Sequence, residues 1–150
     1  MVSLPAWFRQ LKWSAPVNVA NLNLDRKKIP DFPGCYAFTI GMINLIPDQV
    51  LYVGEGKSLR NRIPTYLVAI TKSKAKEGHK GKGFVLEARD KHNDYSVFVR
   101  WVEYGGSDHD RYELEASLIG YLRPGANDRD EEARHGALGD WERLDPRLLR

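Results

Sequence analysis

The chain contains a single cysteine, Cys35, in 150 residues. One cysteine excludes an intramolecular disulfide and every multi-cysteine zinc module, and it is typical of proteins from a reducing compartment. No apolar run is long enough to cross a bilayer, so we expect no membrane association. The first residues, MVSLPAWFRQLKW, have neither an unbroken apolar stretch nor a small-residue cleavage site, unlike a secretion signal. We therefore expect a cytoplasmic protein, in which Cys35 is a small buried apolar residue rather than a nucleophile.

Apolar residues make up 42% of the sequence and aromatic residues 11%, which is typical of a globular domain. The net charge of +3 is unevenly distributed. Residues 57–82 hold eight lysines and arginines against one glutamate, a local charge of +7, so the rest of the chain sums to −4. A basic segment on an acidic body favours a polyanionic partner such as nucleic acid. A solvated lysine-rich loop would have the same charge, and charge alone does not separate the two.

Residue patterns predict three strands and a short first helix. Apolar spacing in residues 4–11 predicts an amphipathic helix that docks on the body. Residues 14–33, which include three prolines, predict an extended connector. The stretches 34–40, 49–54 and 95–105 are rich in β-branched and aromatic residues, and the first two are expected to pair as a hairpin.

Two longer helices are predicted after the second and third strands. Ser58 is a good N-cap for a helix over 59–70, in which Pro64 predicts a kink or a late start. A helix over 110–122 has leucines at i, i+4 and i+8, and its cap is expected at positions 107–108.

The stretch LYVGEGKSLRNR, residues 51–62, predicts a strand, a glycine turn and a helix start that carries Arg60 and Arg62. Backbone amides at a helix start and two guanidinium groups favour an anion such as phosphate. A hairpin would bring Tyr36, on the adjacent strand, close to Tyr52. Taken singly, these residues are more typical of ordinary strand tyrosines and surface arginines than of an active site.

The tripeptides GCY, residues 34–36, and YVG, residues 52–54, resemble the paired motifs of the GIY-YIG nuclease superfamily. The helix SLRNRI is similar to that family's first helix, and the family's essential arginine falls on Arg62. A tyrosine or histidine is usual four residues later in the family, and Tyr66 occupies this position. Two tripeptides and two further matches in order form a far more specific signal than one tripeptide.

The later segment ELEASLIGYLRPGAN resembles the family's metal-binding helix and its trailing asparagine. The glutamate falls on Glu115 and the asparagine on Asn127, so the resemblance covers roughly residues 32–128. Two positions depart from the family pattern. Cys35 replaces the usual aliphatic residue, and Glu55 stands where the repair branch often has a lysine. A carboxylate at this position would weaken the attraction of a phosphate if it pointed into the site.

The resemblance implies an α/β (α+β) fold with a small, mainly antiparallel, three-stranded sheet flanked by helices. It divides the chain into an N-terminal extension that packs on the core (1–31), a nuclease domain (32–128) and a charged tail (129–150). The chain is too short for the family's multi-domain repair incision subunit, so a small stand-alone member is expected.

The resemblance also implies metal-dependent endonuclease activity on DNA. Phosphodiester hydrolysis needs an aligned water, a base and positive charge on the phosphate. Glu115 would bind one Mg²⁺ (or Mn²⁺), Arg62 would hold the phosphate, and Tyr36 with Tyr52 would position and deprotonate water. A free phenol has a pKa of about 10, so a tyrosine base requires nearby positive charge at neutral pH. The expected catalytic residues are Tyr36, Tyr52, Arg62, Tyr66, Glu115 and Asn127, and the expected substrate-binding residues are Gly54, Lys57, Arg60, Lys72 and Lys74.

Two other functions remain open from the sequence. The chain could be a catalytically silent nucleic-acid-binding module that uses its basic segment 57–82. It could also be a toxin-like nuclease that an acidic protein holds at the same segment. RNA is open beside DNA because the phosphate chemistry is shared, and the sequence does not indicate an oligomeric state.

Overall fold

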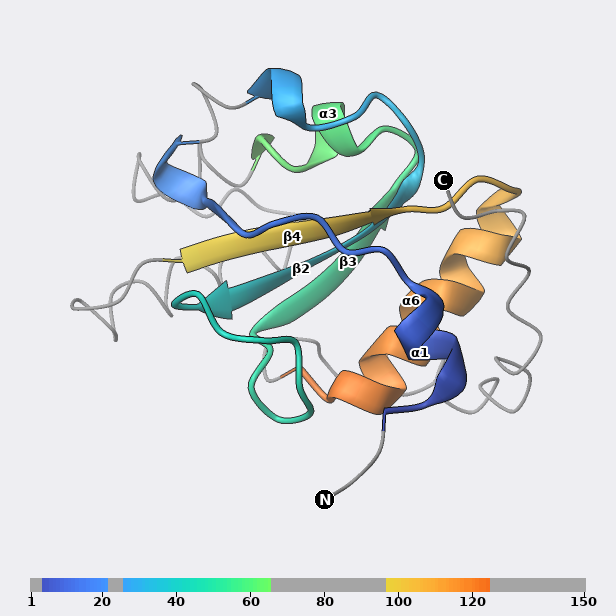
Figure 1. The fold of residues 1–150 in the computed structure, drawn as a ribbon. Coiled ribbons are helices and arrows are strands. Elements are labelled where there is room, and N and C mark those ends of the chain that lie inside the picture. The colour runs from blue at the N-terminus through green and yellow to red at the C-terminus, as the bar shows by residue number, and fades with distance from the viewer. Residues whose placement is uncertain (1–3, 22–25, 66–96, 125–150) are drawn as a thin grey trace, which may run out of the picture.

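The computed structural model describes residues 4–21, 26–65 and 97–124, and within them four strands form one antiparallel sheet (Figure 1). The strands are β1 (Val17–Asn18), β2 (Gly34–Ile40), β3 (Tyr52–Gly56) and β4 (Val97–Glu103), in the order β1-β4-β2-β3. The predicted α+β class with an antiparallel sheet is confirmed. The predicted number of three strands is wrong, because β1 forms within the expected connector and pairs with β4.

The hairpin predicted from the first two β-rich stretches is confirmed, since β2 pairs with β3 from Gly34↔Gly56 to Phe38↔Tyr52. On its other side β2 pairs with β4 along its whole length. All β2 residues except Ile40 are buried, as expected for a central strand covered on both faces. Strand β3 has β2 as its only neighbour in this order, so it is an edge strand of the described sheet.

The sheet has a separate apolar core on each face. Tyr36 and Phe38 of β2 join one cluster, which includes Leu59 and Ile63 from the segment after β3. The alternate β2 residues, among them Cys35, face the other cluster, which the leucines of the last described helix complete. The period-2 alternation of β2 thus sends its tyrosine and its cysteine to opposite faces.

Helices cover both faces of the sheet. Helix α3 (Leu59–Arg62) lies over the face of Tyr36, together with the short 3₁₀ turns η1 (Val19–Asn21) and η2 (Arg26–Lys28). Helix α6 (Asp108–Leu122) and helix α1 (Ala6–Gln10) cover the other face (Figure 1). In the described parts of the chain, no helix is both long and apolar enough to cross a membrane.

The ends of α6 have clear causes. The Ser107 hydroxyl caps its start by accepting from the Asp110 amide. The Asp110 carboxylate accepts from the Ser107 amide at 2.9 Å, which completes a capping box. At its end Arg123 adopts a left-handed conformation with φ of 49°, and its guanidinium donates to both carboxylate oxygens of Asp48 at 3.0 and 2.6 Å. The predicted helix over 110–122 is confirmed and begins slightly earlier.

The predicted docking of the first helix is also confirmed. Phe8 and Leu11 are buried in the same cluster as the leucines of α6, and the Phe8 ring lies 5.0 Å from that of Tyr121. The predicted helix over 59–70 is described only to Thr65, and within this range the helical residues are Leu59–Arg62.

Candidate active site

Tyr36 lies directly over Gly54. The two residues are opposite each other in the β2–β3 pairing. A Cβ added at Gly54 would come 2.4 Å from the Tyr36 hydroxyl oxygen and 2.5 Å from its Cζ atom. Real side chains do not approach so closely, so only glycine allows the ring to lie flat on the edge strand. Tyr36 is 1% exposed, and its ring packs edge-on against Phe38 at a centroid distance of 5.7 Å.

These glycines correct one prediction. Gly54, Glu55 and Gly56 do not form a turn but lie inside β3 and continue its pairing with β2. The glycine pattern has a tertiary cause instead: a Cβ at Gly56 would meet the Arg62 Cβ at 3.1 Å. One glycine thus makes room for the catalytic candidate Tyr36 and the other for the stem of Arg62.

Arg62 reaches the same tyrosine from helix α3. Its Nε donates to the Tyr36 hydroxyl at 3.3 Å. The helix start is fixed by Ser58, whose side chain accepts from the Asn61 amide at 3.3 Å and donates to Asp31 at 2.6 Å. The structure therefore brings Tyr36, Gly54 and Arg62 together, as the sequence predicted, with a guanidinium beside a phenol.

Tyr52 lies on the same face of the hairpin. It stands opposite Phe38, two residues before Gly54, and it is half-buried against the cluster that contains Tyr36. Strand alternation thus directs both tyrosines to the α3 side of the sheet.

The amides of the α3 start do not form the expected anion site. The Leu59 amide donates to the Phe32 carbonyl at 3.0 Å, and the Arg60 amide donates to the Pro30 carbonyl at 3.1 Å. These donors hold the connector rather than a phosphate, because the connector crosses the helix start. A phosphate at this site would depend on side chains such as Arg62.

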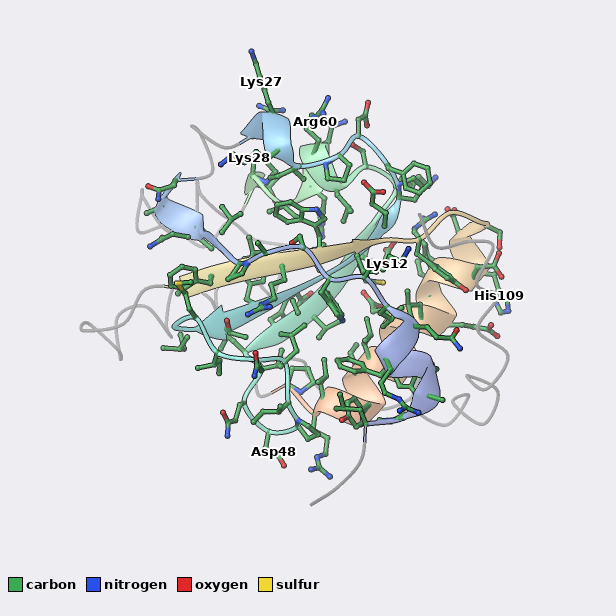
Figure 2. The ribbon with its side chains drawn as sticks, in the orientation of Figure 1. Lys12, Lys27, Lys28, Asp48, Arg60 and His109 are labelled. Atoms are coloured by element: carbon green, nitrogen blue, oxygen red, sulfur yellow. The ribbon has the colours of Figure 1, made fainter. Side chains whose placement is uncertain are left out.

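Arg60 and Lys57 are placed apart from Tyr36. The Arg60 Nε donates to the Ile29 carbonyl at 2.8 Å, which turns Arg60 toward the connector. Figure 2 shows Arg60 at the same end of the molecule as Lys28. Lys57 is exposed, and its ammonium lies 3.5 Å from an Asp108 oxygen. Both remain candidates for contacts with a substrate at the margin of the site.

Glu115 approaches from the opposite face, on helix α6. It is 6% exposed and lies one turn after Arg111. Burial raises the pKa of the Cys35 thiol well above its usual range, and the charges of Glu115 and Glu55 raise it further. Glu115 therefore lies within electrostatic reach of Cys35, on the face of β2 opposite to the Tyr36 side chain, whereas Glu113 is exposed and pairs with His109 at 3.0 Å.

Arg111 is a residue that the sequence did not single out. It is 3% exposed, its Nε donates to Glu55 at 2.9 Å, and its second nitrogen donates to Asp108 at 2.6 Å. The spacing of Asp108 and Arg111 on one helix indicates an ion pair. No local pattern indicates the pairing with Glu55, which is 56 positions away.

Several predicted residues fall outside the described ranges: Tyr66, Lys72, Lys74 and Asn127. Within those ranges, no group of three or more histidine, cysteine, aspartate or glutamate side chains could enclose a metal ion. A single buried carboxylate, Glu115, fits an ion that takes its other ligands from water and a substrate phosphate, as Mg²⁺ does.

Curated proteins with similar sequences include several that are named UvrABC system protein C, although no family model matches the chain. UvrABC system protein C of Pediococcus pentosaceus is 34% identical over 96 residues, which are 64% of this chain and 13% of that protein. The protein of the same name from Limosilactobacillus reuteri (strain DSM 20016) is 39% identical over 96 residues, with the same two shares. The chain thus spans 13% of the length of these curated relatives.

Solved structures with a similar arrangement include the GIY-YIG N-terminal endonuclease domain of UvrC from Thermotoga maritima. A point mutant of that domain bound to its catalytic divalent cation gives a TM-score of 0.46 and 21% identity, covering 73% of this chain and 97% of the domain. The domain bound to magnesium gives a TM-score of 0.45 and 20% identity, covering 72% and 97%.

Proposed function

We propose that the chain is a divalent-metal-dependent endonuclease of the GIY-YIG superfamily that hydrolyses phosphodiester bonds in DNA. The observation that carries the proposal is the bond from Arg62 Nε to the Tyr36 hydroxyl above Gly54. These three residues come from both tripeptide motifs and from the first helix of the resemblance.

The proposed chemistry follows from this pair. A positive charge beside a phenol favours its deprotonated form, so Tyr36 is the base that takes the proton of the attacking water. Tyr52, on the same face, assists in positioning that water. The nitrogens of Arg62 hold the non-bridging phosphate oxygens, and a guanidinium matches their geometry better than an ammonium does.

The metal ligand in this proposal is Glu115. A bound Mg²⁺ or Mn²⁺ would polarise the phosphate and stabilise the leaving oxygen. One carboxylate holds such an ion weakly in the absence of substrate, so we expect metal and DNA to bind together. In this proposal Tyr66 orients water or phosphate, and Asn127 holds Glu115 or the end of its helix in place.

DNA is the proposed substrate because the curated relatives are UvrABC proteins and the basic segment 57–82 suits a polyanion. Those relatives are far longer than this chain, so their cut sites and assembly partners are not carried over.

The test is nicking of supercoiled plasmid in Mg²⁺ and in EDTA by the wild type, Glu115→Gln and Glu113→Gln. Nicking is expected only with metal. Glu115→Gln removes the charge with little change of shape and should lower the rate by at least about 100-fold. Glu113→Gln is the matched control, because Glu113 is exposed on the same helix and pairs only with a surface histidine in the described contacts. Its rate should stay within about threefold of the wild type.

Two outcomes would contradict the proposal. A wild type that binds plasmid without nicking it would favour the silent binding module instead. Equal nicking by the wild type and Glu115→Gln would exclude Glu115 as the metal ligand. The same reactions on a single-stranded RNA would decide whether RNA is also a substrate.

A further inference from the structure

Arg111 and Glu115 are the two buried charged side chains among the described residues. They lie one turn apart on α6, so both face the sheet on the same side of the helix. A buried charge is costly unless hydrogen bonds and opposite charges compensate it. Arg111 has such compensation, from Glu55 at 2.9 Å and Asp108 at 2.6 Å.

The Arg111–Glu55 bond connects the two halves of the proposed active site. Glu55 belongs to β3, between Gly54 and Gly56, and so follows Tyr52 by three residues. Arg111 belongs to the first turn of α6, and Glu115 lies one turn later on the same helix. Lys57, just after β3, adds a weaker contact to Asp108 at 3.5 Å. The edge strand and the helix are therefore joined at one end by a buried, hydrogen-bonded ion pair.

The same bond changes the charge of the strand. Glu55 is 20% exposed and stands opposite Cys35 in the pairing, so its carboxylate lies on the α6 face of the sheet, which is also the face of the proposed metal ligand Glu115. An uncompensated carboxylate there would repel DNA. Arg111 offsets this charge from the neighbouring helix, while Asp108, its second partner, also contacts Lys57. Cys35 lies within electrostatic reach of Glu55, Arg111 and Glu115.

Resting on the proposed function, we propose that Arg111 is a positioning residue of the active site. It fixes the edge strand relative to the helix that carries Glu115, and it neutralises Glu55 so that a phosphate can approach. Arg111 does not touch the substrate in this account; it acts through Glu55 and through the placement of α6.

The test separates charge from folding with three variants, Arg111→Met, Glu55→Gln and the double variant. Methionine fills much of the same space without a charge. The binding of a labelled DNA duplex is measured in EDTA, the Mg²⁺ requirement by the concentration that gives half-maximal nicking, and stability by the thermal midpoint. Arg123→Met is the matched control, since Arg123 is also on this helical segment and also pairs with a carboxylate of another segment, that of Asp48.

Arg111→Met is expected to weaken duplex binding roughly tenfold and to raise the Mg²⁺ requirement, because Glu55 is left unpaired. Adding Glu55→Gln should restore duplex binding to within about threefold, while the thermal midpoint stays below that of the wild type. This recovery of binding without recovery of stability is the result that a purely structural ion pair would not give. Arg123→Met should change neither duplex binding nor the Mg²⁺ requirement.

The inference is overturned if Arg111→Met loses stability but keeps wild-type duplex binding and Mg²⁺ requirement. It is also overturned if the double variant binds duplex no better than Arg111→Met. If Arg111→Met does not fold, Arg111→Lys takes its place: it keeps the charge and should keep duplex binding, and a loss of binding there contradicts the charge argument. A wild type that does not nick DNA refutes the proposed function alone, because duplex binding in EDTA still reports the effect of Arg111.

Discussion

Replacing Gly54 by alanine should disable the site while leaving the chain folded. The new methyl group would lie 2.4 Å from the Tyr36 hydroxyl oxygen, 2.5 Å from Cζ and 2.7 Å from Cε2. Ordinary contact begins at 3.4 Å, so the ring must move by about 1 Å. This displacement also breaks or lengthens the 3.3 Å bond between Arg62 and the hydroxyl.

A misplacement of about 1 Å in a catalytic group lowers the rate by roughly 100-fold, and we expect a loss of this size for Gly54→Ala. The overpacking of a buried ring should also lower the free energy of unfolding by about 1–3 kcal/mol. A domain of this size is expected to tolerate that loss if its stability is in the usual range of about 5–15 kcal/mol.

The assay is nicking of plasmid under single-turnover conditions, with the thermal midpoint measured on the same preparations. Gly41→Ala is the control. Gly41 has a φ of +76°, and nothing lies within 4 Å of an added Cβ, so alanine there strains the backbone without a clash. Gly41→Ala should lower stability by about 1 kcal/mol and leave the nicking rate unchanged. A Gly54→Ala variant that nicks DNA within threefold of the wild-type rate would refute the argument that the position of Tyr36 matters.

Two further predictions concern Arg62 and Cys35. Arg62→Lys keeps the charge but loses the planar fork, so we expect the nicking rate to fall roughly 100-fold with little change in the thermal midpoint; an unchanged rate would mean that a point charge suffices. Burial, with Glu115 and Glu55 nearby, raises the pKa of the Cys35 thiol, so it should resist dithionitrobenzoate at pH 8 in the folded protein. Above a pH of about 9 the unfolded state deprotonates first, so the free energy of unfolding should fall with pH by up to about 1.4 kcal/mol per unit more in the wild type than in Cys35→Ala. Equal slopes in the two proteins would contradict the burial of the thiol.

Local sequence patterns predicted those parts of the fold that local forces determine. The hairpin of β2 and β3 follows from β-rich runs, and α6 follows from its leucine spacing and its cap at Ser107. Strand β1 was not predicted, because two residues have no periodicity and their pairing depends on β4, about eighty positions away.

The candidate site divides in the same way. Tyr36 and Arg62 were predicted from the family resemblance, in which the motifs have a fixed spacing along the chain, and the structure brings their side chains together. The strand conformation of Gly54 was missed, because two glycines around one residue resemble a turn until the Tyr36 ring is known to lie on them. Arg111 was missed because its partner Glu55 is distant in sequence, and only the packing of α6 on β3 brings the two together.

The connector before β2, residues 14–33, determines how far this domain can be shortened at its N-terminal side. The carbonyl groups of Ile29, Pro30 and Phe32 accept the Arg60 side chain and the first two amides of α3. A fragment that starts at residue 32 would remove two of these three acceptors and also β1. This fragment would contain both tripeptide motifs. Helix α3, which places Arg62 next to Tyr36, would lose the two backbone acceptors that bind Arg60. The smallest fragment of this protein that keeps these contacts therefore begins upstream of its motifs, at or before β1.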